Sequence, residues 1–245
     1  ISKSNLKDYY GSISDYNKVL AIDPIYVNTY INRGNSKSNL KDYYGAISDY
    51  NKAIDLSPKS SLAYSNRGIS KDNLGDFEEA VNDYTKSIEL DPDNKKTYFN
   101  RGVSLMNLNN NNEAIDDFNK AITIDPNYIG AYINLGILKK KSNDYNGAIS
   151  NYNKAIELDP NNIKAYYNKA LIYVKLDDHY GAISNYNKVI ELDPNYEFKV
   201  YYNRAISKSS IKDYNGALVD YKKEIERYPN FKSSFRSRGI LKEKL

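Results

Sequence analysis

Helix-breaking, small and aromatic residues recur along this chain with a single period. Successive prolines are 34 residues apart, and only the last interval is 35. Because proline cannot continue a helix, each one marks a break between helices. The prolines are Pro24, Pro58, Pro92, Pro126, Pro160, Pro194 and Pro229. Eight positions before them stand the aromatic residues Tyr16, Tyr50, Tyr84, Phe118, Tyr152, Tyr186 and Tyr221.

Each period predicts two helices that cross closely. A glycine or alanine follows each proline by ten residues, or by eleven after the insertion, and leaves room for the aromatic ring. These residues are Gly34, Gly68, Gly102, Gly136, Ala170, Ala205 and Gly239. Polar residues predicted to cap the second helix of each pair are Asp42, Asp76, Asn110, Asp144, Asp178 and Asp213. Asp76 with Glu79, and Asn110 with Glu113, match the capping-box pattern.

One helix pair cannot bury its own apolar faces, so the pairs are expected to stack as a solenoid. We expect a single array over residues 1–245, with six full repeats at 27–60, 61–94, 95–128, 129–162, 163–197 and 198–231. Residues 1–26 are predicted to be a partial repeat, and residues 232–245 a terminal helix without its partner. The extra residue near Tyr196 and Glu197 should lengthen one turn.

The spacing of Tyr30, Gly34, Ala46, Tyr50 and Pro58 resembles the signature of the tetratricopeptide (TPR) repeat. The resemblance covers the whole chain. It implies an all-α, right-handed solenoid, or superhelix, of antiparallel helix hairpins, with a concave groove that holds a protein or peptide. The main departure is an arginine where the family pattern has leucine before the glycine.

In families of this kind the groove is lined by the first helices. Here the residue eight after each proline, or nine after the insertion, is Asn32, Asn66, Asn100, Asn134, Asn168 or Asn203. Beside these asparagines lie the apolar residues Ile69, Val103, Ile137, Leu171 and Ile206, with Asn35 in the first repeat. A carboxamide both donates and accepts hydrogen bonds, so such a ladder could pair with the backbone of an extended peptide. The alternative is inheritance by duplication, because asparagines also recur on the second helices, for example at Asn51, Asn119, Asn153 and Asn187.

A correlation within the repeats predicts an ion pair between the two helices. Repeats with Arg33, Arg67, Arg101 and Arg204 carry Asp49, Asp83, Asp117 and Asp220 sixteen residues later. The repeats with Leu135 and Lys169 instead carry Asn151 and Asn185. We expect these Arg–Asp pairs to be structural, and worth under about 1 kcal/mol each if they are partly exposed.

Composition narrows the chemistry that the chain can perform. There are no cysteines, which excludes disulfides, cysteine-ligated zinc and thiol catalysis. The single histidine, His179, takes a place held in other repeats by aromatic residues, which indicates packing. No metal, no cofactor and no catalytic activity are expected, and no apolar run is long enough to cross a membrane. The net charge of +4, from 35 basic and 31 acidic residues, disfavours nucleic acid.

The sequence therefore predicts a non-catalytic protein-interaction scaffold. Two alternatives stay open: a helical repeat that binds single-stranded RNA, similar to the pentatricopeptide type, and the substrate-recognition array of a larger enzyme. Phe235, Ile240 and Leu241 lie on the expected unpartnered helix. Exposed apolar residues there predict weak end-to-end self-association.

Overall fold

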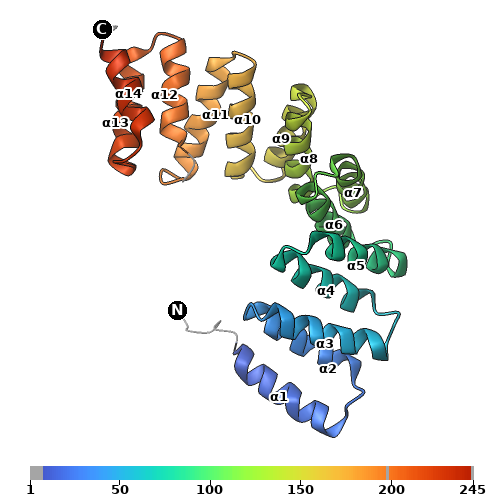
Figure 1. Cartoon of the computed structure of the whole chain (residues 1–245). Helices are drawn as coiled ribbons and strands as arrows, with labels where there is room; N and C mark the ends of the chain where they lie inside the picture. Colours follow the sequence, from blue (N-terminus) through green and yellow to red (C-terminus); the bar gives the residue numbers. More distant parts are fainter. Residues whose placement is uncertain (1–7, 197–198, 244–245) are drawn as a thin grey trace. The chain divides into compact units, whose positions relative to one another are not determined.

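The computed structural model describes residues 8–196 and 199–243, which contain fourteen α-helices and no strand (Figure 1). The helices are α1 (Tyr9–Ile22), α2 (Val27–Asn39), α3 (Tyr43–Leu56), α4 (Ser61–Leu74), α5 (Phe77–Leu90), α6 (Lys95–Asn107), α7 (Asn111–Ile124), α8 (Ile129–Lys141), α9 (Tyr145–Leu158), α10 (Ile163–Lys175), α11 (His179–Leu192), α12 (Val200–Ser210), α13 (Tyr214–Arg227) and α14 (Lys232–Lys242). They form two compact units, one ending at Ala131 and one beginning at Tyr132, and each unit is described by itself.

The helices follow the predicted repeats. Each full repeat holds two consecutive helices joined by a short turn, beginning with α2 and α3 in residues 27–60 and ending with α12 and α13. The second helix of one repeat packs on the first helix of the next, as α3 does on α4 and α11 does on α12. The predicted all-α fold of tandem helix pairs is therefore confirmed. That all 245 residues form one array stays a prediction.

Glycine allows the two helices of a pair to approach closely. A Cβ atom placed on Gly34 would lie only 2.6 Å from Tyr50 Cε1, and one on Gly68 would lie 2.7 Å from Tyr84 Cε1. Gly102 and Gly136 meet Phe118 and Tyr152 in the same way. These four rings are almost completely buried. The predicted contact between a small residue on the first helix and an aromatic ring on the second is therefore confirmed in these four repeats.

The predicted caps are confirmed only where glycine follows the cap by three residues. Asp42 accepts a hydrogen bond from the Gly45 backbone N–H at 2.9 Å. Asp144, Asp178 and Asp213 cap α9, α11 and α13 in the same way, with Gly147, Gly181 and Gly216 as donors.

The two predicted capping boxes are wrong, because neither Asp76 nor Asn110 makes a side-chain cap. A Cβ atom on Gly45 would lie 2.1 Å from Asp42 Oδ2 and 2.8 Å from the capping oxygen, Oδ1, so this placement of the carboxylate leaves no room for a side chain at position 45. Three residues after Asp76 and Asn110, where the capped helices have a glycine, stand Glu79 and Glu113. Glu79 instead forms an ion pair with Lys71 on the preceding helix, at 3.1 Å.

The last helix is only partly unpartnered. Leu241 is buried in a cluster with Ala205, Ala217 and Tyr221, which corrects the expectation that it lies on a free face. Phe235 and Ile240 are exposed, and end-to-end self-association stays a prediction. Of the predicted longer turn, Tyr196 is described, whereas Glu197 lies outside the described residues.

Candidate functional site

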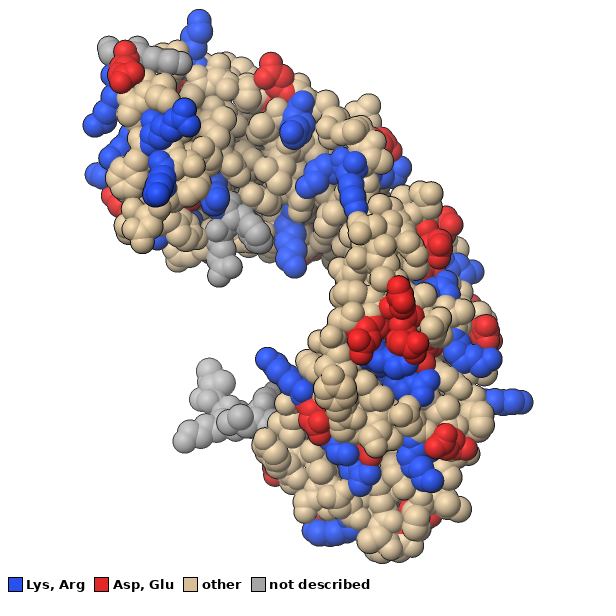
Figure 2. All heavy atoms as spheres, in the orientation of Figure 1, with Lys and Arg blue, Asp and Glu red and all other residues tan. Residues whose placement is uncertain are grey.

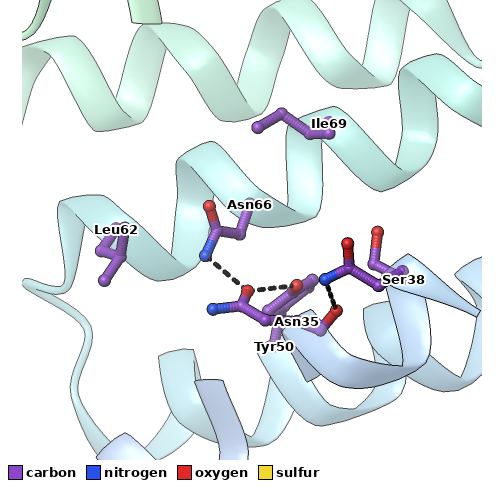
Figure 3. A pocket seen from close by; sticks show the side chains of 7 residues that line it. Asn35, Ser38, Tyr50, Leu62, Asn66 and Ile69 are labelled. Carbon is purple, nitrogen blue, oxygen red and sulfur yellow. Dashed lines mark hydrogen bonds between the residues drawn. The ribbon is translucent and has the colours of Figure 1, made fainter. Parts of the chain in front are cut away.

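The first helices of two neighbouring repeats in the N-terminal unit enclose a hollow of about 430 Å³ (Figure 3). It lies between α2 and α4 and is open to solvent on one side. The residues contributed by α2 are polar, whereas α4 contributes a polar residue between two apolar ones. The lining residues are Asn35, Ser38, Asn39, Tyr50, Leu62, Asn66 and Ile69.

Two asparagines form the centre of this hollow, and a tyrosine fixes their orientation. Asn35 Oδ1 accepts hydrogen bonds from the Tyr50 hydroxyl at 2.7 Å and from Asn66 Nδ2 at 2.8 Å (Figure 3). Burial raises the pKa of Tyr50, so its hydroxyl remains a proton donor at physiological pH. Asn35 Nδ2 and Asn66 Oδ1 have no partner among the described residues. The pair therefore presents one free donor and one free acceptor, which matches the C=O and N–H of a peptide backbone.

Apolar side chains border this amide pair. Leu62 and Ile69 project from α4 on either side of Asn66 (Figure 3). Leu62 is 54% exposed, which is unusual for a large apolar residue on a packed helix. An apolar ligand side chain that covered it would gain about 25 cal/mol for each Å² removed from water.

The structure gives the other predicted ladder residues unequal surroundings. Asn32 is exposed, whereas Asn100 and Asn134 are half-buried, and none of the three side chains makes a hydrogen bond within the described residues. Asn168 uses both of its groups: Oδ1 accepts from Lys140 Nζ at 3.0 Å, and Nδ2 donates to the Lys164 carbonyl. The Asn203 side chain donates to the Tyr167 hydroxyl at 3.3 Å.

The predicted apolar neighbours share one environment, because all five are half-buried on their first helices. They are Ile69, Val103, Ile137, Leu171 and Ile206. Of these, Ile69 lines the hollow with Asn66, so the structure brings together two of the predicted site residues in one enclosed place.

The sequence-based list missed Asn35, Tyr50 and Leu62. Asn35 was visible as the one polar residue at a register that is otherwise apolar, and that exception was the available signal. The hydroxyl of Tyr50 could not be distinguished from the other repeated tyrosines, since its role depends on where Asn35 points.

The predicted Arg–Asp pairs are confirmed in all four repeats that carry both residues. In each pair the arginine Nε and Nη2 reach the two carboxylate oxygens, at 2.5 to 3.0 Å. The aspartate side chains are only 1 to 6% exposed. Lys37, Lys71 and Lys208 add a second cation to three of the four aspartates. The hydrogen bond to Asp49 raises the pKa of Arg33, and the same holds for Arg67 and Arg101 with their aspartates.

Each of these arginines also links its repeat to the preceding one. Its Nη1 donates to a residue sixteen or seventeen positions earlier, on the previous second helix. The acceptors are Asn17, Asn51, Thr85 and Asn187, at 2.6 to 3.0 Å. Asn51 and Asn187 therefore have a structural role in addition to any origin by duplication, because each side chain accepts a hydrogen bond from an arginine of the next repeat.

The described residues contain no cluster of three or more His, Cys, Asp or Glu side chains that could hold a metal ion. None of their helices combines the length and the apolar character that spanning a bilayer requires. His179 is mostly buried, with Nε2 lying 3.0 Å from Asp177 Oδ1, a position consistent with packing. Figure 2 shows basic and acidic side chains interspersed with uncharged surface on the face that it presents.

Sequence families described as "Tetratricopeptide repeat" or "TPR repeat" match residues 27–60, 61–94, 96–128, 138–177 and 163–196. The chain belongs to the tetratricopeptide repeat family. The first two matches coincide with predicted repeats, and TPR membership supports a protein-interaction scaffold in general terms. The matching families indicate no enzyme.

Solved TPR structures resemble this chain over most of its length. A MamA crystal structure is 27% identical, with a TM-score of 0.64, and the match covers 69% of this chain and 92% of MamA. PilF of Pseudomonas aeruginosa is 17% identical, with a TM-score of 0.75 and coverage of 87% and 97%. YrrB, titled "a TPR protein with an unusual peptide-binding site", is 20% identical, with a TM-score of 0.66 and coverage of 80% and 99%. The last two likenesses concern the fold alone. None of the curated proteins matches this sequence.

Proposed function

We propose that this chain is a non-catalytic scaffold that holds an extended segment of a partner protein against its first helices. In the N-terminal unit, the segment docks at the hollow between α2 and α4. The observation that carries the proposal is the Asn35–Asn66 pair, with its free donor and free acceptor beside exposed Leu62. The remaining ladder asparagines and their apolar neighbours extend the contact surface in each unit.

The orientation of the amide pair favours a peptide backbone as ligand. A free carboxamide rotates, and ordering it on binding costs free energy. In the folded chain Tyr50 and Asn66 already fix the Asn35 side chain, so its conformational entropy is lost on folding and not on binding. A peptide N–H can donate to Asn66 Oδ1 while a neighbouring C=O accepts from Asn35 Nδ2, independently of the peptide sequence.

Magnitudes show why the apolar neighbours are needed. Each such hydrogen bond contributes roughly 0.5 to 1.5 kcal/mol net. Ordering a flexible segment costs roughly 2 to 5 kcal/mol or more. Two backbone hydrogen bonds therefore cannot hold a peptide, and side chains placed against Leu62 and Ile69 must supply the rest.

The test is a selection from a phage-displayed library of random 12-residue peptides on the immobilised chain. Peptides enriched by the wild type are synthesised, and their affinity is measured by fluorescence anisotropy. The variant Asn35→Ala with Asn66→Ala removes the amide pair. The control Asn82→Ala removes an exposed asparagine from α5 in the same unit, where no hydrogen bond involves its side chain.

We expect the double variant to lose at least tenfold in affinity, and the control to bind as the wild type does. Circular dichroism must show both variants to be folded. Equal affinities for all three proteins would move the binding surface away from the hollow. Failure of the wild type to enrich any peptide, together with salt-sensitive binding of single-stranded RNA, would favour the nucleic-acid alternative.

A further inference from the structure

One register on the first helices varies from repeat to repeat, in contrast to the asparagine register. It lies fourteen residues after each proline, or fifteen after the insertion, and we term its members the variable positions. They are Ser38, Asp72, Met106, Lys140, Val174 and Ser209. Ser38 lines the hollow between α2 and α4, so this register borders the proposed binding surface.

Asp72 occupies the corresponding place between α4 and α6. Its Oδ1 accepts a hydrogen bond from the Ser104 hydroxyl on α6 at 2.6 Å, and its Oδ2 accepts from the Tyr84 hydroxyl at 2.7 Å. Tyr84 is the counterpart of Tyr50, whose hydroxyl reaches the hollow one repeat earlier. Asp72 therefore lies in the wall of the equivalent surface one repeat further on.

The carboxylate of Asp72 is half-buried without a compensating charge. No cation lies within ion-pair distance of it among the described residues, whereas Asp49, Asp83 and Asp117 in the same unit each have an arginine. Two neutral hydroxyls occupy two of its acceptor positions but leave its charge in place. Burial raises the pKa of Asp72, an effect that the hydrogen bonds from Ser104 and Tyr84 offset only in part.

Lys140 shows the reverse situation in the C-terminal unit. Its amine donates to Asn168 Oδ1, a member of the asparagine ladder, which places it at the binding surface of that unit. No carboxylate of the described residues pairs with it, and burial lowers the pKa of its amine. An ammonium has three donors, of which this contact uses one.

We propose that the variable positions select the side chains of the bound segment, with Asp72 taking a lysine or arginine and Lys140 taking a carboxylate. This inference rests on the proposed function, because it assumes a segment lying along the first helices. The asparagines that recur in every repeat then hydrogen-bond the backbone of the segment. The charged variable positions pair with two of its side chains, which have opposite charges. Each unit makes its own selection.

The test uses the same displayed library of random 12-residue peptides. Peptides selected by the wild type should be enriched in lysine or arginine and in aspartate or glutamate. Asp72→Asn should abolish the basic preference alone, and Lys140→Gln should abolish the acidic preference alone. Asp72→Ser, which copies Ser38 of the first repeat, serves as a second variant in case the first is poorly folded. Asp55→Asn and Lys222→Gln remove the same charges from exposed sites on second helices and should change neither preference.

Synthetic peptides then give the size of the effect. We expect Asp72→Asn to weaken a basic peptide about 10- to 100-fold, the range for a hydrogen bond to a charged group, and to leave its neutral glutamine analogue unchanged. If the wild type selects peptides that depend on Asn35 and Asn66 but show no charge preference, or a preference that these variants leave intact, the inference is overturned and the proposed function stands. If the wild type selects no peptide, both fail together.

Discussion

Two kinds of helix pair occur within this chain, and they differ at two positions. In the pair α4–α5, Arg67 grips both oxygens of Asp83, Lys71 contacts the same carboxylate, and Arg67 reaches back to Asn51. In the pair α10–α11, Lys169 and Asn185 take the same places. Asn185 Nδ2 turns to the Gly181 carbonyl of its own helix at 2.7 Å.

The difference between these two helix pairs shows what the ion pair contributes to the packing of the helices. Each Arg–Asp pair joins three helices: the two of its own repeat and the second helix of the preceding one. Each asparagine substitute closes a hydrogen bond inside a single helix, as Asn151 also does with Gly147. Burial lowers the pKa of Lys169, since no carboxylate lies opposite it. The charged repeats therefore add an ion-pair link between neighbouring repeats that the repeats with Asn151 and Asn185 lack.

The largest expected effect comes from removing one buried carboxylate. Asp83→Asn keeps the shape of the side chain but leaves Arg67 without its anion, whereas Lys71 keeps only its contact with exposed Glu79. We expect a loss of about 3 kcal/mol, because breaking a buried pair leaves a buried charge uncompensated. Urea denaturation followed by circular dichroism measures it. The matched change Asn185→Ala should lower the free energy of unfolding by about 1 kcal/mol or less. Equal losses in the two variants would show that the Arg–Asp pairs stabilise the fold no more than the asparagines do.

A second effect concerns two acids one turn apart on α13. Asp220 has Arg204 and Lys208 as partners, whereas neither carboxylate oxygen of fully buried Glu224 has a hydrogen-bond partner. Burial raises the pKa of Glu224, an effect partly offset by the nearby charges of Arg227 and Lys199. The folded chain then binds more protons than the unfolded chain above pH 4.5, the ordinary glutamate pKa. Stability should therefore fall as pH rises from 4.5 through the folded pKa.

Glu224→Gln tests this sign directly. The variant should be more stable than the wild type at pH 7 by about 1 to 2 kcal/mol and should lose that part of the pH dependence. Denaturation at pH 4.5 and pH 7 measures both quantities. Glu226→Gln, at an exposed site on the same helix, is the control. A variant less stable than the wild type at pH 7 would show that the Glu224 carboxylate is stabilised in the fold.

A third prediction transfers the ion pair to a repeat that lacks it. Lys169→Arg with Asn185→Asp restores the arginine and aspartate, and exposed Asn153 stands where Asn51 serves Arg67. We expect the two substitutions to couple by about 1 kcal/mol in a double-mutant cycle. Additive single effects would mean that the helix pair α10–α11 cannot adopt the geometry of the other pairs.

The smallest effect separates capped helices from uncapped ones. Asp42→Ala should cost about 1 kcal/mol, because the Gly45 N–H loses its acceptor. Asp76→Ala should cost only a few tenths of that, since Asp76 makes no cap. Thermal melting of the two variants compares them, and equal shifts would contradict the assignment of a cap to Asp42 and not to Asp76.

Most of the fold could be predicted from the sequence because the same pattern of prolines, small residues and aromatic residues recurs seven times. The prolines, the glycine–aromatic contact and the Arg–Asp pairs are local or short-range features, and each recurs. The capping boxes failed although their spacing fits the pattern. In the capped second helices a glycine stands three residues after the aspartate, as at Gly45, whereas Glu79 stands there after Asp76, which makes no cap. The hollow could be predicted only in part. It depends on Asn35, a single departure from the repeat, and on the hydroxyl of Tyr50, whose partner is that same asparagine on the other helix of the pair.

The central claim is that a peptide backbone lies against the Asn35–Asn66 pair. Because the chain contains no cysteine, Asn39→Cys, at the exposed edge of the hollow, can be labelled with a benzophenone maleimide at one place only and keeps Leu62. Illumination with a library-selected peptide should cross-link that peptide at position 39 and not at the outer control, Asn82→Cys. Equal cross-linking at both positions, or cross-linking at position 82 alone, would contradict binding in the hollow.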